Sequence, residues 1–225
     1  MTPLSVPPVF RGALAALARI DERDAESLIR ELSECPPFKA VAELQALAGE
    51  AVPDGYREDA ESLVPALLTL STLSRTNPLT AGTTAIADAA SLSADLEVDD
   101  DARQALRARL ERLLNATAIY TTAAAVDLLT QHPRNYGVSR VVTDMRPVFA
   151  QDVEERPSGA VLVHTLQLQT WNRDGRTETL YVAMDEADLR ELQRTVGRAL
   201  DKTNTLVQLL VDQRISYFQL DERTT

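Results

Sequence analysis

The segment from Gly159 to Arg214 constrains the fold more than any other part of this chain, because its hydrophobic period changes once along its length. Between Ala160 and Trp171, leucines and one histidine occupy every second position from 162 to 168, the period of a strand with one buried face. The tight turn Asn172-Arg173-Asp174-Gly175 follows, in which the glycine supplies a positive φ. A second alternating run then ends at Met184. We expect a β-hairpin here.

The hydrophobic period changes from two residues to that of an α-helix at Asp185. Aspartate is a favourable N-cap, and Asp188 at the third helical position complements the helix dipole. Met184 and Leu189 have the spacing of a hydrophobic staple. The second strand is therefore expected to run directly into a long helix.

This expected helix carries an apolar stripe whose members are three and four residues apart, as in a heptad repeat. One hairpin covers only a short length of such a stripe, so the remainder requires another strand, the N-terminal part or a second subunit. A core helix that packs only on its own sheet is the alternative. The stripe consists of Leu189, Leu192, Val196, Ala199, Thr203, Leu206 and Leu210, and is widened by Leu200, Val207 and Val211.

The N-terminal part has the pattern of successive amphipathic helices. Pro65 is expected to kink or split one of them. Asn77 followed by Pro78 is expected to cap and open another. The expected helices cover residues 8–20, 22–34, 37–48, 57–74, 78–92 and 101–131.

The boundary between the helical and alternating parts is expected at His132-Pro133-Arg134-Asn135-Tyr136-Gly137, which has the composition of a linker. Ser139 to Ala150 then predicts a further strand, which Pro147 restricts to a sheet edge or a bulge. The predicted fold class is α+β. An all-α helical domain at 1–132 and a linker at 133–138 precede a three-stranded antiparallel sheet with a long C-terminal helix at 139–225.

The net charge argues against nucleic acid and anionic membranes as partners. The chain carries 23 basic and 34 acidic side chains, a net charge of −11, and both parts are acidic. Phosphate binding needs clustered positive charge. The sequence contains neither a long apolar run that would span a membrane nor a basic region before the first apolar run. A cytoplasmic location is therefore expected.

Nucleophilic catalysis has little support in the sequence. Cys35 is the only cysteine, lies on the apolar side of an expected helix, and is interpreted as a small buried hydrophobe. His132 and His164 are the only histidines, and neither forms a recognisable motif with it. Neither a nucleophile elbow nor a zinc-protease motif is present. No catalytic or cofactor-binding residues are predicted, although an unfamiliar carboxylate site stays an alternative.

Metal binding by the acidic run at 95–101 is not predicted either. If Asp95 were the first residue of a calcium loop, Asp100 would replace the required glycine and Leu106 the required glutamate. The run is interpreted as a loop that caps the next helix, because carboxylates before a helix complement its dipole.

The C-terminal part resembles the COMM-domain proteins in the order of its elements and in three motifs. Thr143-Asp144-Met145-Arg146-Pro147 is similar to the family's first-strand motif of Asp-Trp-Arg-Val type, with Met145 in place of Trp and Pro147 in place of Val. VLVHTLQLQ resembles the second strand, and LYVAMDEADLRELQRTV resembles the third strand running into the final helix.

The resemblance implies a non-enzymatic adaptor. COMM domains pair face to face as obligate dimers and act as scaffold subunits of larger protein assemblies. The residues indicate the same independently, because a three-stranded sheet with one covering helix buries too little surface alone.

The predicted function is a protein scaffold that forms a homodimer or higher oligomer, either with copies of itself or with related subunits. The alternative is an acidic regulatory protein that inhibits a partner enzyme or a nucleic-acid-binding protein. Trp171 is either a hydrophobe at the hairpin end or a contact anchor. The predicted interface residues are Met145, Arg146, Leu162, Leu166, Trp171, Tyr181, Leu189, Leu192, Val196, Leu206 and Leu210.

Overall fold

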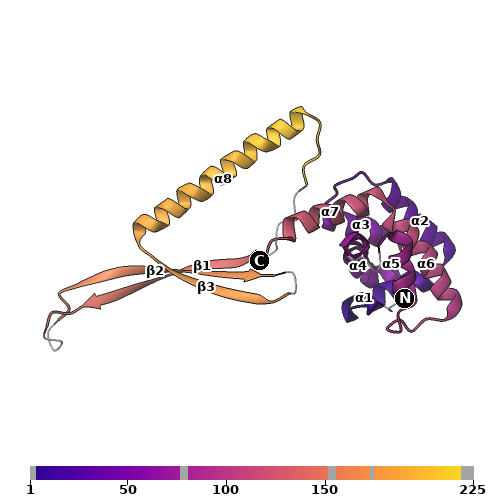
Figure 1. Ribbon diagram of the computed structural model, residues 1–225, viewed down its shortest axis with the longest axis horizontal. Helices are drawn as coiled ribbons and strands as arrows, with labels where there is room; N and C mark the ends of the chain where they lie inside the picture. The colour runs from indigo at the N-terminus through magenta and orange to yellow at the C-terminus, as the bar shows by residue number, and fades with distance from the viewer. Residues whose placement is uncertain (1–3, 77–80, 152–155, 173–174, 219–225) are drawn as a thin grey trace. The chain divides into compact units, whose positions relative to one another are not determined.

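The α+β class predicted from the sequence is confirmed. The computed structural model describes residues 4–76, 81–151, 156–172 and 175–218 (Figure 1). Helices come first, followed by a three-stranded antiparallel sheet and a C-terminal helix. The chain divides into two compact units, one holding Met1–Leu128 and Ser216–Thr225 and the other Leu129–Ile215.

Seven α-helices and one short 3-10 helix precede the sheet in the described residues. Asn77 and Pro78, predicted to open a helix, lie outside those residues, and the next described helix starts at Thr83 behind Gly82. The elements are α1 (Pro8–Arg19), α2 (Glu22–Glu34), α3 (Val41–Ala51), η1 (Asp54–Tyr56), α4 (Arg57–Thr76), α5 (Thr83–Ser91), α6 (Asp100–Leu114) and α7 (Thr117–Thr130).

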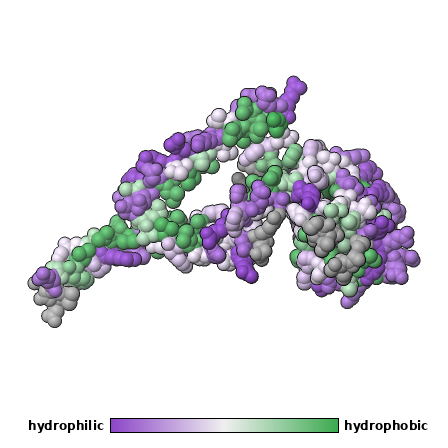
Figure 2. All heavy atoms as spheres, viewed as in Figure 1, coloured by the Kyte–Doolittle hydropathy of each residue, from purple (hydrophilic) through white to green (hydrophobic). Residues whose placement is uncertain are grey.

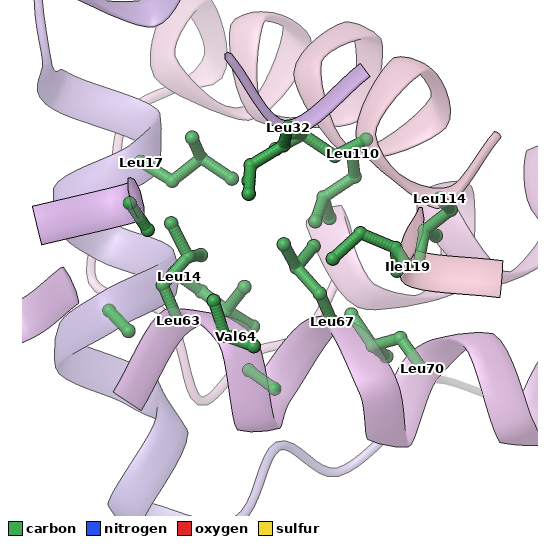
Figure 3. Close-up of a cluster of buried hydrophobic side chains, with 14 of the residues drawn as sticks. Leu14, Leu17, Leu32, Leu63, Val64, Leu67, Leu70, Leu110, Leu114 and Ile119 are labelled. Carbon is green, nitrogen blue, oxygen red and sulfur yellow. The ribbon is translucent and has the colours of Figure 1, made fainter. Parts of the chain in front are cut away.

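The helical unit has one hydrophobic core, to which several helices contribute leucine or isoleucine side chains (Figure 3). Leu14, Leu32, Leu67, Leu110 and Ile119 come from α1, α2, α4, α6 and α7, and none is more than 1% exposed. Each such side chain contributes about 1.5–3 kcal/mol through burial. The helices of this unit therefore form its hydrophobic core by themselves.

The single helix predicted at 101–131 is wrong, because the chain bends by 70° between α6 and α7. Asn115 ends α6, and its side-chain amide donates to the Glu111 carbonyl at 2.8 Å. Asparagine competes with helical backbone bonds in this way. The apolar spacing continues across the bend, which is why the sequence reads as one helix.

The third helix begins at Val41 rather than at Pro37. Phe38 has a left-handed φ of 59°, and its N–H donates to the Thr121 hydroxyl at 3.1 Å. Thr122 donates to the Lys39 carbonyl at 3.0 Å. Tertiary hydrogen bonds from α7 thus hold this segment out of the helix that its sequence favours.

Of the kink or split expected at Pro65, the split does not occur, and α4 continues through the proline. Proline has no N–H to donate to the carbonyl four residues earlier, that of Glu61. The Gln45 side chain on α3 donates to that carbonyl instead, at 2.7 Å. A neighbouring helix therefore replaces the missing donor.

Replacing Gln45 with alanine should lower the free energy of unfolding by about 1 kcal/mol, because the Glu61 carbonyl loses this donor. In a Pro65→Ala background the restored backbone N–H takes over, so Gln45→Ala should have a smaller effect. Urea denaturation of the four variants measures the coupling. Equal losses in both backgrounds would contradict this account.

The second unit is an antiparallel sheet with the strand order β1-β2-β3, followed by a helix. β1 pairs with β2 along its length, whereas β3 pairs only with residues 164–171 of β2. The hairpin of β1 and β2 therefore continues past β3 as a two-stranded ribbon (Figure 1). The elements are β1 (Asn135–Val148), β2 (Gly159–Trp171), β3 (Thr177–Met184) and α8 (Glu186–Asp212).

β1 begins at Asn135, inside the segment predicted as linker. The Asn135 amide donates to the carbonyls of Thr130 and His132 and so fixes the start of the strand. A register shift follows between Tyr136 and Val138. A Cβ on the intervening Gly137 would lie 2.8 Å from the Gln169 carbonyl oxygen, so the bulge requires glycine.

The junction between β3 and α8 has the expected N-cap. The Asp185 carboxylate accepts the Asp188 N–H at 2.9 Å, and the Asp188 carboxylate accepts the Asp185 N–H at 3.0 Å. This reciprocal pair is a capping box. Gly175 has the predicted positive φ of 75°, while Arg173 and Asp174 of the predicted turn lie outside the described residues.

Candidate protein interface

The strand register places every leucine and methionine of the sheet on one face, whereas its valines divide between both faces. Met145 lies opposite Leu162, and Leu166 pairs with β1 on one side and β3 on the other. Directly opposed residues in an antiparallel sheet point to the same side. We call this side the apolar face; its apolar side chains are Val141, Met145, Leu162, Leu166, Leu168, Leu180, Val182 and Met184.

The apolar face lacks a covering layer. Met145 is 69% exposed, Leu162 59% and Leu180 56%. In the described part of the sheet, Asn135 is the only residue classed as buried. Figure 2 shows hydrophobic side chains along the strands and along α8. Thr143 and His164 lie on the same side, between Leu162 and Leu166. Exposed apolar side chains gathered on one face in this way indicate an interaction surface.

The opposite face of the sheet is mixed. Arg140 donates to the Gln167 side chain at 2.5 Å. The Trp171 indole N–H donates to the Tyr136 carbonyl at 3.1 Å, which favours the hairpin-end interpretation of this tryptophan. Of the predicted interface residues, Arg146, Trp171 and Tyr181 lie here.

The predicted interface residues of the sheet therefore divide between its two faces. Met145, Leu162 and Leu166 lie together on the apolar face. The prediction omitted Val141, Leu168, Leu180, Val182 and Met184, although the two-residue period already placed several of them beside the chosen leucines.

α8 presents its apolar stripe without cover. None of its residues is buried, and Val196, Leu200 and Leu206 are each half exposed or more. Leu189 and Leu210 are half-buried at its two ends. The remaining stripe therefore stays open to a partner.

The other side of α8 is charged. Arg190 pairs with Glu186, and Arg194 pairs with Glu191 at 2.5 Å. Such exposed pairs along a helix suit a face that stays in water. α8 is thus amphipathic along most of its length.

One end of the sheet carries a groove of about 440 Å³. Leu168 and Leu180 contribute the apolar lining, and Arg134 and Glu178 form an ion pair beside it at 2.9 Å. The groove extends the apolar face toward the hairpin end. Its apolar lining and polar rim suit the binding of an apolar side chain from a partner.

Cys35 is buried, and desolvation raises the pKa of its thiol. A nucleophilic cysteine requires the opposite shift, toward thiolate. His164 shares a hydrogen bond of 2.8 Å with the Thr143 hydroxyl. Within the described ranges, no three metal-ligating side chains lie close enough to hold an ion.

The acidic run also has structural roles. Asp99 caps α6 by accepting the Ala102 N–H at 2.8 Å. Asp95 accepts the Val6 N–H at 2.9 Å and forms an ion pair with Arg11 at 3.0 Å. The backbone hydrogen bond from Val6 and the positive charge of Arg11 lower the pKa of the Asp95 carboxyl.

Comparison with known proteins assigns no family. Neither a model of a protein family nor a curated protein sequence matches the chain. Among the described helices, none alone has the length and apolar character needed to span a membrane, although α6 and α7 pass that test together as a bent pair. Leu106 and Leu110 of α6 and Ile119 of α7 lie in the core of the helical unit, as side chains of core helices do.

Proposed function

We propose that the protein is a non-enzymatic scaffold or adaptor in the cytoplasm, and that it self-associates through its β-β-β-α unit. The observation that carries this proposal is the absence of buried residues in α8, beside a sheet whose apolar face is also uncovered. A three-stranded sheet needs a packed layer for stability. A second copy supplies both missing layers at once.

The two uncovered surfaces are chemically complementary. Leucine, valine and methionine side chains form the apolar face, and leucine and valine dominate the stripe of α8. Packing one against the other removes both from water, which is the main driving force for obligate association. The COMM-like order of elements agrees with such pairing.

We expect the chain of residues 1–225 to be a dimer or larger assembly at micromolar concentration in size-exclusion chromatography with light scattering. Because the buried surfaces are apolar, raising the salt concentration from about 0.1 M to about 1 M should not dissociate it. A stable monomer would contradict the proposal. An acidic regulatory protein would instead bind its partner in a strongly salt-dependent way.

A further inference from the structure

The two outer edges of the sheet differ in how they present backbone hydrogen-bonding groups. Residues of an antiparallel strand alternate between those that bond to the neighbouring strand and those whose N–H and C=O point the other way. The Asn172 N–H donates to the Arg176 carbonyl at 3.0 Å, so residues 172 and 176 form a hydrogen-bonded pair. Counting in steps of two from this pair shows which residues of β2 and β3 bond to each other. Even-numbered residues of β3 therefore bond to β2, and the outward groups belong to Thr177, Thr179, Tyr181 and Ala183.

The outer edge of β1 is protected. The same alternation directs the odd-numbered residues of β2 toward the even-numbered residues of β1. Pro147 consequently falls at an outward position, where it lacks the N–H that an incoming strand would need. Proline is one of the devices that keep edge strands from pairing.

The outer edge of β3 has no such protection. Its sequence, TETLYVAM, contains neither proline nor lysine, and its pairing with β2 continues without a bulge. Seven of its eight residues are exposed. It is therefore the edge available for pairing.

We infer that β3 pairs antiparallel with β3 of a second copy and forms a continuous six-stranded sheet. This inference rests on the proposed self-association. In antiparallel pairing, directly opposed residues must both point their backbone groups across the junction. Outward residues of one copy therefore face outward residues of the other. Because odd-numbered residues then lie opposite odd-numbered residues, the apolar faces of both copies lie on the same side of the six-stranded sheet. The two α8 helices can then pack against this one continuous surface.

The side chains of β3 suit a two-fold junction. Glu178 is its only charged residue and lies near one end, so a two-fold axis at Leu180 or Tyr181 does not place it opposite itself. Like charges directly opposed would destabilise the pair. A two-fold junction also uses the same patch on both subunits, as closed dimers do.

Thr179→Pro tests this edge, because it removes an outward N–H and leaves the bonds to β2 in place. We expect the dimer dissociation constant to rise at least about 100-fold in sedimentation measurements. Thr143→Pro is the matched control, since it removes an outward N–H from β1 and also a hydroxyl that bonds His164. It should leave the dimer intact. Equal behaviour of the two variants would overturn the inference.

Cross-linking tests the same edge without proline. In a Cys35→Ser background, Tyr181→Cys should form a disulfide-linked dimer under mild oxidation, whereas Met145→Cys on β1 should not. A dimer that cross-links through Met145→Cys but not through Tyr181→Cys has its sheets stacked face to face. That result overturns edge pairing and leaves the scaffold proposal standing. If the unsubstituted protein is a monomer, both the edge pairing and the proposed self-association are wrong.

Discussion

Replacing Arg109 with methionine should lower the free energy of unfolding of the helical unit by about 3 kcal/mol. Arg109 lies on α6 and is only 6% exposed. Its guanidinium donates to the carbonyls of Leu17 at 2.8 Å and Ile20 at 2.9 Å, and it pairs with Glu22 at 2.7 Å. Methionine fills a similar volume but leaves these carbonyls without their donor.

The expected loss is large because the carbonyls belong to the C-terminal end of α1, where backbone acceptors have no helical partner. A charged donor at this end also complements the helix dipole. Removing one partner of a buried charged group costs several kcal/mol, since the groups left behind stay desolvated.

Arg112→Met is the matched control, one turn further along α6. Arg112 is half exposed and pairs with Glu26, with Nη2 2.8 Å from Oε2. The hydrogen bond with Arg112 lowers the pKa of the Glu26 carboxyl. Water replaces an exposed pair readily, so this variant should lose much less stability. Denaturant titration compares the two, and similar losses would contradict the role assigned to Arg109.

Features determined by neighbouring residues could be predicted from the sequence. The change of period at Asp185 located the start of α8, and Gly175 located the hairpin turn. Both signals lie within a few residues of the structure that they specify. The alternation along β2 likewise indicated that one face of the sheet is apolar.

Features that depend on distant residues could not be predicted. Gln45 compensates for Pro65 from another helix, and Arg109 acts on carbonyls about ninety residues away. The interface prediction mixed the two faces only partly for this reason, because the two-residue period alone already separates Met145 from Arg146 and Leu166 from Trp171. The position of Arg146 or Tyr181 relative to Leu166 depends on the strand register, which periodicity within one strand does not determine.

Leu206→Glu should dissociate the proposed dimer. Leu206 lies on the apolar stripe of α8 and is 58% exposed in the single chain, so a partner must supply its cover. A carboxylate at this place would be buried without a partner, at a cost of several kcal/mol. We expect the dissociation constant to rise at least about 100-fold. Glutamate favours helix nearly as well as leucine, so α8 itself should persist.

Gln208→Glu separates burial from charge. Residues 206 and 208 are two positions apart on a helix, so their side chains point in nearly opposite directions. Both variants add one negative charge to a chain that already carries −11. General repulsion between subunits would weaken both dimers alike, whereas burial of the stripe predicts that only Leu206→Glu dissociates. Sedimentation of the two variants at equal ionic strength distinguishes these causes, and an undisturbed Leu206→Glu dimer would exclude this part of α8 from the interface.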